Sequence, residues 1–254
     1  MRLLACDGNG KLSFTKDITK DAEIPPYAIL SHTWQEGQEV TFDELRKDCV
    51  TAKQKSGYDK IWFCMRQAQR ANLHHIWVDT CCINKAEDLA ELQHALNSMF
   101  KWYQRAVECY VYLSDVSTSS DSAWEPAFRT SRWFTRGWTL QELLAPRDVI
   151  FFSREGLQLG TKTTLEQQIH EVTSIPLSAL RGTPLSEFSV EERLSWVKGR
   201  KTKHKEDKAY SLLGIFNVFM PTNYGEGKEY AFMRLRREIG APYETTSIPE
   251  KNAS

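Results

Sequence analysis

The stretch from Arg136 to Glu142 (RGWTLQE) combines residue types that could act together on one ligand. Trp138 and Glu142 are four residues apart, so in a helix they share a face and offer a ring and a carboxylate to the same molecule. Arg136 lies just before them. Spacing alone favours another interpretation, a packed tryptophan with Glu142 paired to a basic neighbour such as Arg136 or Arg147, because structural ion pairs also perturb carboxylates.

Further polar residues follow two apolar runs. Ser31, His32, Thr33 and Trp34 come at the end of the first run and could contact a ribose or a phosphate through hydroxyl, imidazole and backbone N–H groups. Asp79 ends the second run. Each has a structural alternative: Ser31 can cap a turn, and Asp79 can hydrogen-bond to the loop after it.

The six cysteines show no C-x-x-C spacing that would indicate zinc, and no metal site is predicted. If Cys81 lay beside His32, the thiol could act as a nucleophile and the imidazole as its general base. Cys81 and Cys82 follow an apolar run, however, where a free cysteine is usually a small buried hydrophobic residue. We therefore expect reduced, buried thiols.

Charge and hydropathy exclude several classes of function. Lys plus Arg (33) equals Asp plus Glu (33), so no long-range field would gather nucleic acid. The basic cluster Lys198–Lys205 favours a solvated loop, with weak anion binding as the alternative. There is no apolar run long enough for a membrane span, no secretory leader and no glycine-rich phosphate loop. These features predict a cytoplasmic protein without a membrane span.

Short apolar runs alternate with helical periodicity along the first 153 residues. The predicted strands are 27–31, 75–79, 109–113 and 149–152. The predicted helical segments are 42–71 with a break at Ser56-Gly57, 91–105, and 124–144 with a break at Gly137. Strands joined by helical crossovers indicate an α/β fold, with a mostly parallel sheet flanked by helices.

An open parallel sheet binds ligands beyond the carboxyl ends of its strands. The loops 32–35, 79–85 and 114–122 should therefore share one rim, with helix 133–144 close by. After residue 153 the pattern becomes helical, at 164–173, 190–198 and 208–217. We divide the chain into an α/β core (1–153), a helical C-terminal extension (154–244) and a linker or disordered tail (245–254).

Three blocks resemble the HET domain of fungal heterokaryon-incompatibility proteins, in the order that family shows. They are YAILSHTW (27–34), WVDTCCINK (77–85) and RGWTLQE (136–142). The later segments SLLGIF (211–216) and YGEG (224–227) are similar to the trailing part of the family, so the resemblance covers about residues 1–240. It implies an effector of allorecognition and programmed cell death at the amino end of a receptor, followed by NACHT and WD-repeat modules.

A more distant resemblance links WTLQEL (138–143) to the helix of plant TIR domains that carries their catalytic glutamate. The order of elements is also similar, which implies a TIR-like fold. Carried over, the resemblance makes Glu142 the catalytic residue of an NAD glycohydrolase. Ser31, His32, Thr33, Trp34, Asp79, Arg136 and Trp138 would then bind the substrate.

Cleavage of the nicotinamide–ribose bond needs no metal and no cofactor, because nicotinamide leaves as a neutral molecule. A carboxylate stabilises the oxocarbenium-like ribose electrostatically. The resemblance further implies that activity follows self-association into a homo-oligomer. The alternative is a non-enzymatic adaptor that signals through a homotypic surface, with Trp34 and Trp138 as buried anchors.

Overall fold

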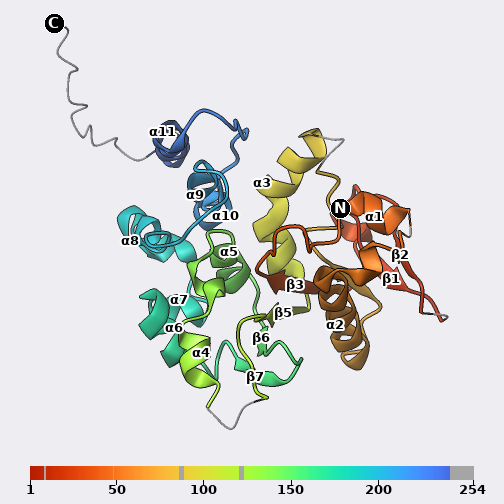
Figure 1. Ribbon diagram of the computed structural model, residues 1–254. Coiled ribbons are helices and arrows are strands. Elements are labelled where there is room, and N and C mark those ends of the chain that lie inside the picture. The colour runs from red at the N-terminus through yellow and green to blue at the C-terminus, as the bar shows by residue number, and fades with distance from the viewer. Residues whose placement is uncertain (9, 48, 86–88, 120–122, 241–254) are drawn as a thin grey trace, which may run out of the picture.

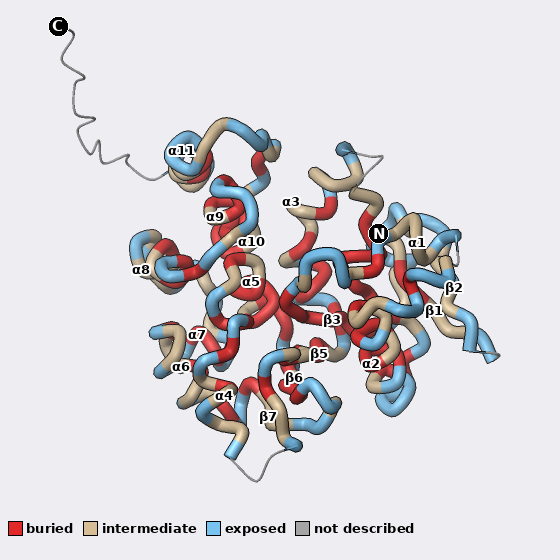
Figure 2. The backbone as a smooth tube through the Cα atoms, viewed as in Figure 1, coloured by how far each residue is buried: buried red, intermediate tan, exposed pale blue. Residues whose placement is uncertain are grey.

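A seven-stranded sheet with the order β2-β1-β4-β3-β5-β6-β7 forms the centre of the chain (Figure 1). The computed structural model describes residues 1–8, 10–47, 49–85, 89–119 and 123–240. Buried segments gather in β3, β5 and α5 (Figure 2). In the described part of the chain, no helix has the length and apolar character needed to cross a membrane. The tail 245–254 lies outside the described residues.

The four central strands are parallel, which confirms the predicted α/β class. They are β3 (Ala28–His32), β4 (His75–Trp77), β5 (Glu108–Tyr112) and β6 (Val149–Phe152). Each coincides with a predicted apolar run to within two residues. Successive strands lie on either side of β3, so a topological switch point falls between the carboxyl ends of β3 and β5.

Three antiparallel strands at the edges were not predicted. β1 (Leu4–Cys6) and β2 (Leu12–Phe14) form a hairpin against β4, and β7 (Gln158–Thr161) pairs with β6. Strands of three or four residues are too short to show a clear alternation of apolar and polar residues. Because β7 belongs to the sheet, the sheet continues past residue 153, the boundary that the sequence suggested.

Helices cover both faces of the sheet. On one face α2 (Ser56–Arg70) places Phe63 5.0 Å, between ring centroids, from both Tyr112 and Phe152. On the other face Trp133 lies 5.5 Å from Phe151, and α3 (Leu89–Arg105) and α5 (Thr139–Leu144) pack together. Because successive strand residues face opposite sides of the sheet, neighbouring site residues point toward different helices.

The predicted helix, break and second helix within 42–71 are confirmed, but the break lies between Arg46 and Ser56, and Ser56-Gly57 begins α2. The chain between α1 (Phe42–Arg46) and α2 instead contains the 3-10 turn Ala52–Gln54. Gly57 serves a close approach: its N–H donates to the Gln38 carbonyl at 2.9 Å, and a Cβ on Gly57 would lie 2.6 Å from that oxygen. The glycine therefore reflects packing and not a turn.

The break predicted at Gly137 is confirmed. Before it lie α4 (Glu125–Arg129) and the 3-10 turn Arg132–Thr135, and after it lies α5.

The chain after β7 is helical, as predicted, and lies together beside α5 (Figure 1). Its helices are α6 (Glu166–Thr173), α7 (Leu177–Leu180), α8 (Val190–Ser195), α9 (Asp207–Tyr210), α10 (Leu213–Phe216) and α11 (Lys228–Ile239), with a 3-10 turn at Leu185–Glu187. The predicted helix 208–217 is divided between α9 and α10, and α7 and α11 were not predicted.

Candidate functional site

Glu142 lies in α5 with its side chain buried against β3. The Ser31 hydroxyl donates a hydrogen bond to Glu142 Oε2, and the Trp133 indole Nε1 donates to Ser31 Oγ at 2.7 Å. Ser31 is fully buried, and Glu142 is 6% exposed. A relay from the indole through the hydroxyl to the carboxylate therefore sets the position of Glu142, and Ser31 does not cap a turn.

Burial is the main influence on the acidity of Glu142, and it raises the pKa of this carboxyl to about 8. The negative charge of Asp79 acts in the same direction. The hydrogen bond from Ser31, the positive charge of Arg200 and the nearby Tyr103 hydroxyl act against it. A carboxyl that titrates near neutral pH in a buried position is a frequent feature of catalytic sites.

A second polar cluster surrounds Asp79 at the end of β4. His32 Nε2 lies 3.1 Å from Asp79 Oδ1, and Trp34 Nε1 donates to Asp79 Oδ2 at 3.0 Å. Lys85 Nζ lies 3.8 Å from the same carboxylate and 4.0 Å from the centre of the Trp34 ring. Burial alone would raise the pKa of Asp79, but Lys85, His32 and Trp34 together hold it below the usual value.

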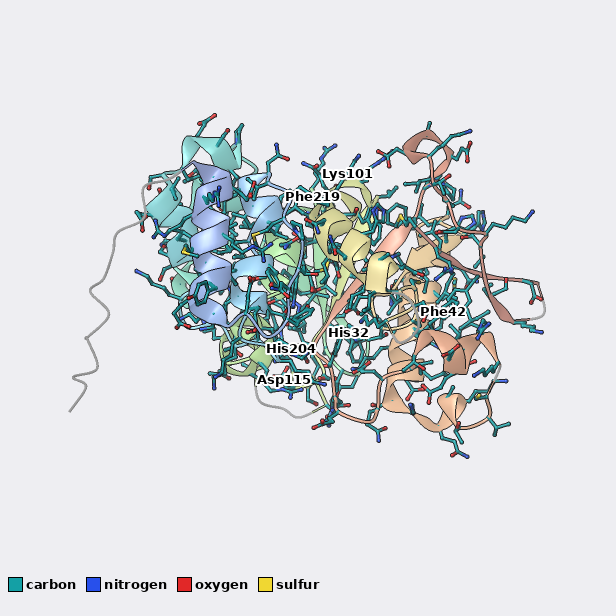
Figure 3. The ribbon with its side chains drawn as sticks, turned by 90° about the horizontal axis from the view of Figure 1, so that it is seen from above. His32, Phe42, Lys101, Asp115, His204 and Phe219 are labelled. Atoms are coloured by element: carbon teal, nitrogen blue, oxygen red, sulfur yellow. The ribbon has the colours of Figure 1, made fainter. Side chains whose placement is uncertain are left out.

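Ser31 and His32 are neighbours in the sequence but belong to different clusters. Because strand side chains alternate, Ser31 faces α5 and His32 faces the opposite side, where its Nδ1 lies 3.7 Å from Glu39 Oε2. Figure 3, seen from above, places His32 between the N-terminal elements and the C-terminal helices. Asp79 joins the clusters through its electrostatic effect on Glu142.

Thr33 and the loop after β5 complete the rim. Thr33 is buried; its carbonyl accepts from Lys60 Nζ at 3.1 Å, and its hydroxyl from Arg132 Nη2 at 3.5 Å. Asp115, which follows β5, accepts hydrogen bonds at 2.8 Å from the Ser131 hydroxyl and from the Arg132 backbone N–H. The three predicted loops thus share one rim, although residues 120–122 lie outside the described residues.

Arg136 and Trp138 contact the C-terminal extension. The Arg136 carbonyl accepts from Arg200 Nη1 at 2.8 Å. The Trp138 indole lies close enough to the Asp207 carboxylate to act against the rise that burial causes in the pKa of Asp207. Among the described ion pairs none joins Glu142 to Arg136 or Arg147, and Arg147 is exposed beside Asp148. The structure therefore joins Glu142 to Ser31, and Asp79 to His32 and Trp34, while Arg136 and Trp138 lie against the extension.

Arg200 is the residue near Glu142 that the sequence analysis missed. It is 3% exposed and lies in the basic cluster Lys198–Lys205, which was predicted to be a solvated loop. That prediction was wrong for Arg200, because its guanidinium donates to the carbonyl of Arg136 and the hydroxyl of Thr139. A run of six cationic and polar residues shows no pattern that would single out the buried one.

The glycine of the RGWTLQE block permits this contact with the extension. Gly137 N–H donates to the Lys201 carbonyl at 2.9 Å, and a Cβ on Gly137 would lie 2.4 Å from Thr202 Cγ2. We expect Gly137→Ala to lower the free energy of unfolding by about 1–3 kcal/mol in urea denaturation. Adding Thr202→Ser removes the clashing methyl and should restore most of the loss. A double variant as unstable as Gly137→Ala would contradict this explanation.

The thiols give no support to nucleophilic chemistry. All six cysteines are free, and burial raises the pKa of the Cys81 thiol well above its usual value. A low pKa is what activates a cysteine nucleophile. Among the described residues no group of His, Cys, Asp and Glu side chains has the arrangement of a metal site.

A wide cleft of about 1200 Å³ lies elsewhere, between α3, the α5–β6 turn, α7 and α10. Neither Glu142 nor the Asp79 cluster lines it.

Comparison with known proteins identifies the family to which this chain belongs. Residues 27–127 match the family model described as heterokaryon incompatibility protein (HET), and the chain belongs to the HET family. The chain is 54% identical to the vegetative incompatibility protein HET-E-1 of Podospora anserina over 246 residues, and this match covers 94% of the chain. The chain spans only 18% of that relative. No solved structure matches this chain.

Proposed function

We propose that this domain is an effector of allorecognition cell death that cleaves NAD at the nicotinamide–ribose bond once copies assemble. The observation that carries the proposal is the buried Glu142 carboxyl, positioned by Ser31 and Trp133 at the carboxyl edge of a parallel sheet. Its position in WTLQEL is that of the catalytic glutamate implied by the TIR resemblance. The six free thiols fit a cytoplasmic site of action.

The proposed cleavage of NAD depends on the negative charge of the Glu142 carboxylate. The ionised Glu142 carboxylate stabilises the positive charge that develops on the ribose as nicotinamide leaves, and in a buried site this stabilisation is stronger than in water. The positively charged nicotinamide ring of bound NAD also favours the ionised form, which offsets the high pKa of the free site. The Asp79 cluster supports the proposal with hydrogen-bonding groups for ribose and with Trp34 for stacking.

The test is nicotinamide release from NAD by the purified domain over a range of protein concentrations. We expect release per molecule to rise with concentration as copies assemble. The control is NADH, whose reduced ring carries no positive charge and is a poor leaving group, so it should remain intact. A sample that oligomerises but releases no nicotinamide from NAD would overturn the proposal.

A second candidate is a non-enzymatic adaptor, and the exposure of Trp34 favours it. Its side chain lies at the rim with 41% of its surface exposed, although its indole N–H is bonded to Asp79. Exposed tryptophans often anchor protein interfaces. In this case Trp34 would contact a second copy, and the downstream NACHT and WD-repeat modules proposed for the whole protein would control that contact. Toxicity that survives Glu142→Gln but not Trp34→Ala would favour the adaptor.

A further inference from the structure

The C-terminal extension reaches the candidate site through the segment after α8. Lys201 N–H donates to the Thr135 carbonyl at 2.6 Å, and Gly137 N–H donates back to the Lys201 carbonyl at 2.9 Å. Arg136 and Lys201 form a parallel β-bridge. These two backbone hydrogen bonds, which make up the bridge, attach this segment to the chain that leads into α5.

These contacts place Arg200 beside the first turn of α5. Its Nη1 donates to Thr139 Oγ1 at 2.9 Å, and its Nε donates to the Trp196 carbonyl at 3.2 Å. Thr139 and Glu142 are three residues apart in α5 and are both buried, so they lie on the same side of the helix. The guanidinium is therefore anchored one turn from the carboxylate.

The partners of Arg200 leave its charge without direct compensation. Its hydrogen bonds go to carbonyl and hydroxyl oxygens, and none of the described ion pairs includes it. Its Nη2 is buried and has no hydrogen-bond partner among the described residues. Burial lowers the pKa of Arg200 to about 10, and Glu142 is the charge that acts against this. Burying a guanidinium without a paired anion costs free energy, so the ionised Glu142 carboxylate would lower the free energy of the buried Arg200.

We propose that Arg200 is a positioning residue that favours the ionised form of the Glu142 carboxylate, so that the C-terminal extension completes the site. The catalytic part of this inference rests on the proposed function. The electrostatic interaction between Arg200 and Glu142 does not depend on any substrate. It assigns the extension a part in the chemistry, which the TIR resemblance does not.

The other main influences on Glu142 come from groups without a positive charge, and the buried Lys162 donates to the carbonyls of Leu143 and Pro146. Asp79, after β4, repels the carboxylate, whereas Ser31 in β3 donates a hydrogen bond to it. The Tyr103 hydroxyl in α3, which donates to the Leu30 carbonyl at 2.8 Å, also lowers the pKa of Glu142. Cys109 in β5 is a neutral thiol whose own pKa is raised well above the usual value. Arg200 is the cation named among the influences on Glu142.

The direct test is a pH titration of the Glu142 side-chain carbon by carbon-13 NMR, with Glu142→Gln to assign the signal. In Arg200→Met the midpoint should rise by roughly one pH unit or more, because a nearby positive charge is lost. Arg200→Lys keeps the charge and should retain most of the wild-type value. Lys203→Met is the matched control, since Lys203 is an exposed cation of the same loop, and its midpoint should not change.

Equal midpoints in the wild type and Arg200→Met, or equal rises in the Arg200 and Lys203 variants, would overturn the inference. If Arg200→Met does not fold, Thr139→Val provides the second variant, because it removes the hydroxyl that anchors Arg200 and leaves the charge in place. Its midpoint should also rise. An unchanged midpoint in a folded Thr139→Val domain would count against the inference.

The pH profile of nicotinamide release separates this inference from the proposed function. If both hold, the acid limb of the profile moves to higher pH in Arg200→Met by the same amount as the NMR midpoint. A shifted midpoint in a wild type that never cleaves NAD would remove the enzyme proposal and keep the electrostatic role of Arg200. Cleavage that depends on Glu142, with midpoint and acid limb both unmoved by Arg200→Met, would remove the role of Arg200 alone.

Discussion

Glu142→Gln is expected to reduce nicotinamide release from NAD by about 100- to 1000-fold or more, because removing one preorganised electrostatic contact typically costs that much. The amide keeps the shape of the side chain and can still accept the hydrogen bond from Ser31, so the loss would come from the missing charge. Glu108→Gln is the matched control. Burial also raises the pKa of Glu108. Glu108 is the first residue of β5 and lies at the amino end of the strand, away from the rim, so the Glu108→Gln variant should stay active.

The same variant is expected to stabilise the fold at alkaline pH. Burial raises the pKa of Glu142 from 4.5 to about 8, so the folded state holds a proton that the unfolded state releases between these values. The carboxyl therefore lowers stability progressively as pH rises from about 4.5 to 8, by on the order of 5 kcal/mol at most. Glutamine avoids this cost.

Thermal denaturation at several pH values measures the effect. The gain in Tm of Glu142→Gln over the wild type should grow from pH 5 to pH 8 and then level off. A gain that is constant with pH would show that Glu142 is not buried in the way described, and an active Glu142→Gln enzyme would remove Glu142 from the catalytic role.

Gly214→Ala is expected to be the most destabilising of the small substitutions considered, with a loss of about 3 kcal/mol or more. In an ordinary helix this change adds about 1 kcal/mol of stability. Here a Cβ on Gly214 in α10 would lie 2.0 Å from Phe100 Cβ and 2.3 Å from Phe100 Cγ in α3. Both atoms are at the base of the side chain, so the ring cannot rotate away without moving the helix.

Urea denaturation compares this variant with Gly8→Ala, whose added Cβ would meet no atom within 4 Å and should change stability by less than about 0.5 kcal/mol. The added Phe100→Ala change removes the ring but leaves its Cβ, so it should recover only part of the Gly214→Ala loss. A Gly214→Ala domain as stable as the wild type would mean that α10 does not pack on α3 at this distance.

The amino-acid sequence by itself determined the central strands, the long helix α3 and the edge of the sheet that holds the site. Each of these depends on apolar residues close together in the chain, as in Val149–Phe152, which forms β6 as predicted. The pattern of strands also predicted that the loops after Ser31 and at Asp79 share one rim, with the helix that carries Glu142 close by, because the carboxyl ends of parallel strands meet there.

Only the tertiary structure decided which of these residues meet. Ser31 and Glu142 are 111 residues apart, and Arg200 and Thr139 are 61 apart. The alternation of side chains in β3 separates Ser31 from His32, and the close approach allowed by Gly137 buries Arg200 in the site. Local patterns indicate which element a residue belongs to. Contacts between distant segments depend on how those elements pack, and no local pattern records that packing.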